Sequence, residues 1–135
     1  MKRYLVLYLA TLLSMLPLDM LFLRVLAKDY FNSQVGQLLT KEPNVPAAVL
    51  FYLLYVAGIV IFVSATATSW KSTLLYGALF GFMCYMTFEL TNRVLVNDWT
   101  WGVVIVDLAW GTFVTAVVAT LGWLAAEWLA PLAAR

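Results

Sequence analysis

The hydrophobic pattern of the chain consists of four long apolar stretches with short polar segments between them. They cover about residues 4–27, 46–64, 73–96 and 100–129. Each is close to or above the roughly 20 residues with which a helix crosses the hydrocarbon core of a bilayer. The pattern therefore predicts an all-α integral membrane protein, a single domain of residues 1–135 folded as a four-helix bundle. We expect Pro17 to bend the first span and Pro46 to begin the second.

The longest polar connection, KDYFNSQVGQLLTKEPNVP, covers residues 28–46 and joins the first two spans. Its apolar residues recur at roughly helical spacing with polar residues between them. This pattern predicts either a short helix lying in the membrane interface or an ordered loop packed on the bundle. Both interpretations stay open at the level of the sequence.

Composition supports the membrane assignment, because 64% of the residues are hydrophobic and only 11% are charged. So few charges would leave the surface of a soluble domain uncovered. The net charge of +1 gives no reason to expect a nucleic-acid partner. The chain has no histidine and a single cysteine, Cys84, so we expect no metal site, no cofactor and no intrachain disulfide.

Several charged and polar residues nevertheless lie inside the predicted spans. With a rise of about 1.5 Å per helical residue, Asp19 lies ~13 Å inside one membrane face, and Glu89 and Asp107 each lie ~12 Å inside the same face. Arg24 and Arg93 lie about one turn nearer to that face. The sequence therefore predicts a layer of three carboxyl groups below a pair of guanidinium groups.

The helical faces of the third and fourth spans favour a close approach of two of these acids. Two stripes of small residues at i+4 spacing let membrane helices pack closely and lead to Glu89 and Asp107. We expect these two carboxyl groups to form a coupled pair, with Asn92 and Tyr85 beside them. The stripes contain the predicted helix-packing residues Gly77, Gly81, Gly111 and Thr115.

Three acids against two arginines leave one negative charge uncompensated. A proton, a cation, the positive group of a ligand or a neighbouring chain must balance this charge. Three interpretations follow: the polar groups hold the helices together, they form a binding or proton-transfer site, or they catalyse a reaction. Our candidates for ligand or proton binding are Asp19, Arg24, Tyr85, Glu89, Asn92, Arg93 and Asp107.

Three segments resemble a known family: LPLDMLFLRVL, VPAAVLFYLLYVAGIVIF and GALFGFMCYMTFELTNRVLVNDWTWGVVIVDLAWG. They are similar to small bacterial four-span proteins that are grouped as predicted membrane proteins with a domain of unknown function. That family often has aspartate at the position of Glu89, which preserves a carboxylate. The resemblance implies four spans and a bacterial origin, and it implies no activity.

The functional expectation is a non-catalytic membrane protein that binds a small polar or lipid-headgroup ligand at its carboxylate and arginine cluster. The alternative is an accessory subunit of a larger membrane complex, and a third class is an intramembrane enzyme that modifies lipids. An enzyme is disfavoured because the sequence has no nucleophile, metal or cofactor motif. The expected partners are membrane lipid and either a second copy of the chain or a larger membrane complex.

The basic residues near the span ends favour one orientation. Lys2, Arg3, Lys71 and Arg135 fall on the side of the termini, and Lys28, Lys41 and Arg93 fall on the other side. The excess of one basic residue predicts cytoplasmic termini in a bacterial inner membrane.

Overall fold

The computed structural model describes residues 1–39 and 42–131, and in this part of the chain all regular structure is helical. The predicted all-α membrane fold is confirmed, because four helical segments are long and apolar enough to cross a membrane. These candidate spans are Lys2–Leu26, Val45–Ser64, Trp70–Leu95 and Trp101–Leu129.

The first span is α1 (Lys2–Leu21) followed by the π-helical segment η1 (Phe22–Leu26), and the second is α3 (Val45–Ile59) followed by the π-helical segment η3 (Val60–Ser64). The other two are α4 (Trp70–Leu95) and α5 (Trp101–Leu129). Pro17 lies inside α1, which continues to Leu21.

Local sequence signals explain where three of the long helices begin. The side chains of Asn44, Ser69 and Thr100 each accept a hydrogen bond from a backbone N–H of the first turn of α3, α4 and α5, respectively. Such caps satisfy one of the four backbone donors that a helix start leaves unpaired. Pro46 follows the first of these caps, where its missing N–H has no cost.

Helices α4 and α5 pack together along a seam of small residues. A methyl group added at Gly77 would lie 3.0 Å from the Cα of Ala116, and one added at Gly81 would lie 2.6 Å from the Cβ of Thr115 and collide with the carbonyl oxygen of Gly111. The two backbones are therefore in direct contact, which only glycine permits at these points.

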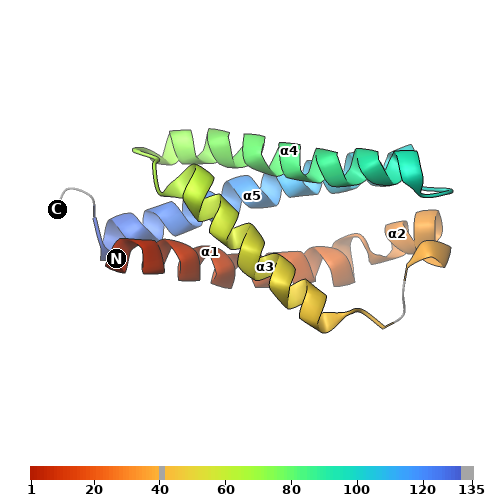
Figure 1. Cartoon of the computed structure of the whole chain (residues 1–135), viewed down its shortest axis with the longest axis horizontal. Coiled ribbons are helices and arrows are strands. Elements are labelled where there is room, and N and C mark those ends of the chain that lie inside the picture. Colours follow the sequence, from red (N-terminus) through yellow and green to blue (C-terminus); the bar gives the residue numbers. More distant parts are fainter. Residues whose placement is uncertain (40–41, 132–135) are drawn as a thin grey trace.

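Helix α3 crosses the bundle diagonally (Figure 1). Its C-terminal part and η3 pack against the other helices, with Val56, Ile59 and Val63 buried in the apolar core. The N-terminal end of α3 diverges from α4 in this view. The bundle is therefore closed near the termini and splayed at its other end.

The connection between the first two spans contains a short helix, α2 (Lys28–Val35), and a 3₁₀ turn, η2 (Gly36–Leu38). Of the two interpretations of this segment, the helical one is confirmed. Helix α2 packs against the end of the bundle, where Val35 is buried and the ring of Phe31 meets the ring of Phe22 with centroids 5.8 Å apart.

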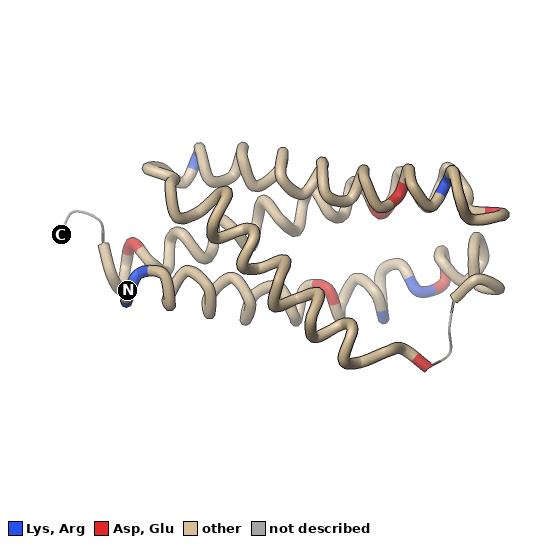
Figure 2. Tube along the Cα trace, viewed as in Figure 1, with Lys and Arg blue, Asp and Glu red and all other residues tan. Residues whose placement is uncertain are grey.

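Charged residues gather at the two ends of the bundle and in the half that carries α2 (Figure 2). Helix α3 has no charged residue along its length. The splayed half is also the half in which charged residues lie deep inside the candidate spans, whereas at the other end they lie within three residues of a span end.

Candidate functional site

A cavity of about 450 Å³ opens where α3 diverges from α4, and we call it the cleft. Exposed side chains at its rim include Phe51 of α3 and Phe88 of α4, so the cleft reaches the outer surface of the bundle. The lining comes from all four candidate spans and comprises Asp19, Phe22, Leu23, Ala48, Phe51, Tyr52, Tyr55, Cys84, Tyr85, Phe88, Asp107 and Trp110.

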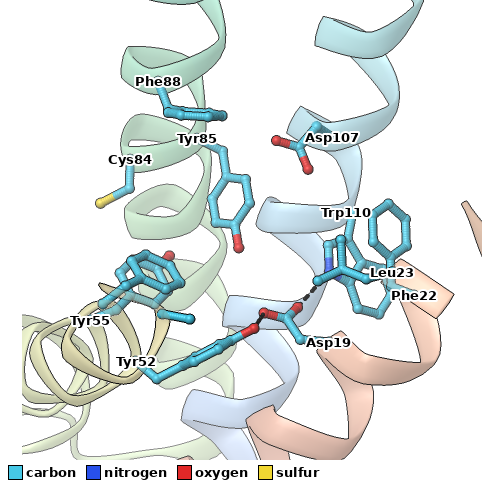
Figure 3. Close-up of a pocket in the computed structure, with 12 residues that line it drawn as sticks. Asp19, Phe22, Leu23, Tyr52, Tyr55, Cys84, Tyr85, Phe88, Asp107 and Trp110 are labelled. Atoms are coloured by element: carbon cyan, nitrogen blue, oxygen red, sulfur yellow. Dashed lines mark hydrogen bonds between the residues drawn. The ribbon is translucent and has the colours of Figure 1, made fainter. Parts of the chain in front are cut away.

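The carboxyl group of Asp19 lies at the inner wall of the cleft and is held by two donors. The hydroxyl of Tyr52 donates to one oxygen at 2.8 Å, and the indole Nε1 of Trp110 donates to the other at 2.9 Å (Figure 3). Phe22 fixes the indole from the other side, since the two rings stack with centroids 4.4 Å apart. Asp19 is thus tied by neutral donors to α3 and α5.

Tyr85 points its hydroxyl into the same cleft (Figure 3). Its ring lies directly on Gly111, where any added side chain would overlap the ring atoms. Glycine at this position therefore creates the space in which the tyrosine ring lies. Next to it, the hydroxyls of Tyr55 and Thr115 share a hydrogen bond of 2.7 Å, which joins α3 to α5 across the floor of the cleft.

A second cavity of about 310 Å³ lies between α2 and the end of the bundle, and we call it the chamber. Glu89 lines it and is almost fully buried, with one oxygen accepting a 2.8 Å hydrogen bond from the indole Nε1 of Trp99. Asp107 also lines the chamber, and its carboxyl group is close enough to that of Glu89 for the two to interact electrostatically. Leu23, Phe88 and Asp107 line both cavities, so the cleft and the chamber adjoin.

Comparison with known families gives one match over most of the chain. Residues 4–124 match the model of the family described as "Predicted membrane protein (DUF2177)". The chain belongs to this family. The predicted resemblance to an uncharacterised membrane protein family is thereby confirmed, and the DUF2177 match carries no activity with it. No curated protein and no solved structure matches the chain.

In this DUF2177 chain, four of the candidate residues lie around the two adjoining cavities. Asp19 and Tyr85 line the cleft, Glu89 lines the chamber, and Asp107 lines both. The expected contact between Glu89 and Asp107 is present. These four side chains come from three different spans. The helical faces predicted the approach of Glu89 and Asp107, and the depth estimate placed Asp19 at the same level.

The arginines of this DUF2177 chain do not join the acids. Arg24 and Arg93 are both exposed, and within the described residues neither lies at ion-pair distance from a carboxylate. Arg24 lies in the π-helical segment η1 and is exposed, whereas Asp19 is buried. The guanidinium of Arg93 lies over the ring of Trp101, 5.0 Å from its centroid. The predicted pair of guanidinium groups above the acids is thus replaced by neutral donors.

Asn92 is only partly buried and lines neither cavity. The residues that do hold the carboxylates, Tyr52, Trp99 and Trp110, were not predicted. Trp99 resembles an ordinary interfacial tryptophan near the end of a span. Trp110 follows Asp107 by three residues, a spacing that could have placed it near the acids, whereas nothing in the charge-free span around Tyr52 indicates its role.

One ion pair lies at the opposite end of the bundle. Arg3 is buried, its Nη1 lies 3.0 Å from Oε1 of Glu127, and the same nitrogen donates to the carbonyl of Ala130 at 3.0 Å. Among residues 1–39 and 42–131, the Nε and Nη2 atoms of Arg3 have no hydrogen-bond partner. This pair joins the beginning of α1 to the end of α5 and takes no part in either cavity.

Proposed function

We propose that this protein binds an amphiphilic molecule from the membrane in the cleft between α3 and α4. The single observation that carries this proposal is a cavity of about 450 Å³ whose rim is apolar and exposed and whose inner wall presents Asp19, Tyr85 and Asp107. Ligand pockets typically have volumes of ~300–1,000 Å³, mostly apolar walls and a few convergent polar groups. The cleft has all three properties.

The position of the opening supports a ligand that arrives from the bilayer. Ala48, Phe51 and Phe88 lie at the rim and are exposed on candidate spans, where the surrounding medium is lipid. An apolar chain can pass between them without leaving the hydrocarbon. Its polar end would then reach hydrogen-bonding groups that are otherwise costly to keep inside a membrane.

The charge on the inner wall of the cleft indicates which kind of polar head group the ligand can carry. Within the described residues, no lysine or arginine lies at ion-pair distance from Asp19, Glu89 or Asp107. These groups accept hydrogen bonds and attract positive charge. An alkyl amine or alkyl alcohol should therefore bind, whereas an alkyl carboxylate should be repelled.

Three amphiphiles of equal chain length test this selectivity: dodecylamine, dodecanol and dodecanoate. Each is added to the protein in dodecyl maltoside micelles, and thermal unfolding is followed by circular dichroism. A ligand that binds only the folded protein raises the Tm with its concentration. We expect a rise with the amine and the alcohol and none with dodecanoate. Equal stabilisation by all three would contradict the proposal.

Two neighbouring alanines provide a matched control for the site. Ala47 and Ala48 are both exposed on the first turn of α3, but only Ala48 lines the cleft. We expect Ala48→Trp to fill the rim and remove the response to dodecylamine. Ala47→Trp should keep it, and loss of the response in both variants or in neither would overturn the assignment of the cleft.

We further propose that the protein lies in the bacterial inner membrane with its termini in the cytoplasm. The small excess of basic residues near the termini supports this orientation. Two of the residues counted, Lys41 and Arg135, lie outside the described residues. Trypsin added to inside-out vesicles should cleave after Lys71, at the beginning of the third span. Cleavage after Lys41 in place of Lys71 would reverse the orientation.

A further inference from the structure

The chamber beneath α2 combines charges of both signs that do not meet each other. Lys28 and Asn32 line it from α2, and Glu89 and Asp107 line it from α4 and α5. Lys28 and Asn32 are four residues apart and therefore lie on the same face of α2. Within the described residues, Lys28 is not at ion-pair distance from either acid. The chamber thus keeps a cation and two carboxyl groups apart across a space of about 310 Å³.

The order of these groups along the adjoining cavities is defined by Asp107. Asp107 lines the cleft and the chamber, whereas Glu89 and Lys28 line the chamber alone. Asp107 and Glu89 are in contact. A chain that enters through the cleft therefore meets the carboxyl pair where the cavities adjoin, and Lys28 and Asn32 are reached only in the chamber beyond.

We propose that the chamber takes the polar end of the same amphiphile and that this end is zwitterionic, with a cation at Glu89 and Asp107 and an anion at Lys28 and Asn32. This inference rests on the proposed function, because the cleft must hold the apolar chain. A zwitterion satisfies both sets of charges in the chamber at once, whereas a simple amine leaves Lys28 without a counter-charge. The order along the ligand is chain, then cation, then anion.

Two quaternary ammonium amphiphiles with the same chain isolate the contribution of the anion. N-dodecyl-N,N-dimethylglycine carries a carboxylate beyond its ammonium group, and dodecyltrimethylammonium lacks it. Binding is measured in dodecyl maltoside micelles by tryptophan fluorescence, since Trp110 and Trp99 line the cleft and the chamber. We expect the glycine derivative to bind about tenfold more tightly, the size of one hydrogen bond to a charged group.

The variant Lys28→Gln should abolish this difference by weakening the binding of the glycine derivative, and it should not weaken the binding of dodecyltrimethylammonium, because it removes a like charge from the chamber. Lys71→Gln is the matched control, because Lys71 is also exposed but begins α4 at the other end of the bundle. It should keep the tenfold preference. Dodecylphosphocholine, in which the anion precedes the cation, should bind more weakly than the glycine derivative.

The possible results separate the two proposals. If dodecyltrimethylammonium binds and Ala48→Trp prevents its binding, but the glycine derivative has no advantage that depends on Lys28, the zwitterion proposal is wrong and the cleft proposal stands. Equal affinity for the two zwitterions would also overturn the proposed order of charges. If neither quaternary amphiphile binds the wild-type protein, the proposed function itself fails.

Discussion

The hydrogen bonds to Asp19 allow a quantitative test of how the cleft is built. Asp19 is only 5% exposed and accepts from Tyr52 at 2.8 Å and from Trp110 at 2.9 Å. An Asp19→Asn side chain has the same shape but a single acceptor oxygen, so one of the two donors loses its acceptor. A buried donor without a partner costs about 1–3 kcal/mol. In membrane proteins, measured side-chain hydrogen bonds average ~0.6 and reach ~1.7 kcal/mol.

We therefore expect Asp19→Asn and Tyr52→Phe each to lower the free energy of unfolding by about 1–2 kcal/mol. The double variant should lose less than the sum, by about 1 kcal/mol, because the hydroxyl that Asp19→Asn deprives of its acceptor is absent once Tyr52 is replaced by Phe. The assay is reversible unfolding in mixed micelles of a mild detergent and sodium dodecyl sulfate.

Tyr8 provides the control for this double-mutant cycle. Its hydroxyl also donates to α3, at 2.9 Å to the carbonyl of Leu53. It lies 11 residues before Asp19 on the same helix, about 16 Å away. Tyr8→Phe and Asp19→Asn should therefore be additive within about 0.5 kcal/mol. If Tyr52→Phe is additive with Asp19→Asn to the same degree, the carboxylate does not hold α3 as the geometry indicates.

Two further predictions concern the seam and the acid pair. Gly81→Ala should lower the free energy of unfolding by about 1–3 kcal/mol, because its methyl group collides with α5. In the same unfolding assay Gly36→Ala is the control: its methyl group would make ordinary contacts, so the variant should be neutral or stabilising by up to ~1 kcal/mol. Glu89 and Asp107 both line the chamber, and among the described residues no lysine or arginine lies at ion-pair distance from either, so we expect a proton to balance part of their charge. A protonated carboxyl band should appear in infrared difference spectra and change in Glu89→Gln and in Asp107→Asn, and its absence would mean that the pair holds no proton.

The spans were predictable because their signals are local and strong. Long apolar stretches indicate the candidate spans. Capping residues such as Ser69 and Thr100 indicate where helices begin, to within a few residues. The small-residue stripes that contain Gly81 are also visible as a period of four. The diagonal course of α3 was not predictable, since a helix that is apolar on every face has no pattern that indicates its direction of packing.

The site was predictable only in its acids. A carboxylate inside an apolar span is conspicuous, so Asp19, Glu89 and Asp107 can be found from the sequence alone. Of their partners, only Trp110 has a spacing that indicates a position near the acids. Tyr52 and Trp99 have no such signal, because tyrosine and tryptophan are common in membrane spans for reasons unrelated to hydrogen bonding. Pairing the acids with Arg93 relied on spacing along α4, but a long flexible side chain can equally reach an aromatic ring on α5, as it does here.

Among the described residues, buried charged side chains form an ion pair at one end of the bundle and none at the other, and this difference favours a binding role over a purely structural one. At the end near the termini, Arg3 meets Glu127 at 3.0 Å, so a buried cation and an acid balance each other and join α1 to α5. At the other end, Glu89 and Asp107 are adjacent, and in the described part of the chain no lysine or arginine lies at ion-pair distance from either, although Lys28 lines the same chamber. Charges that served only to hold helices together would be more stable if paired as at the first end. A carboxyl pair kept without a cation beside two cavities leaves its charge to be met by a proton or by the positive group of a ligand.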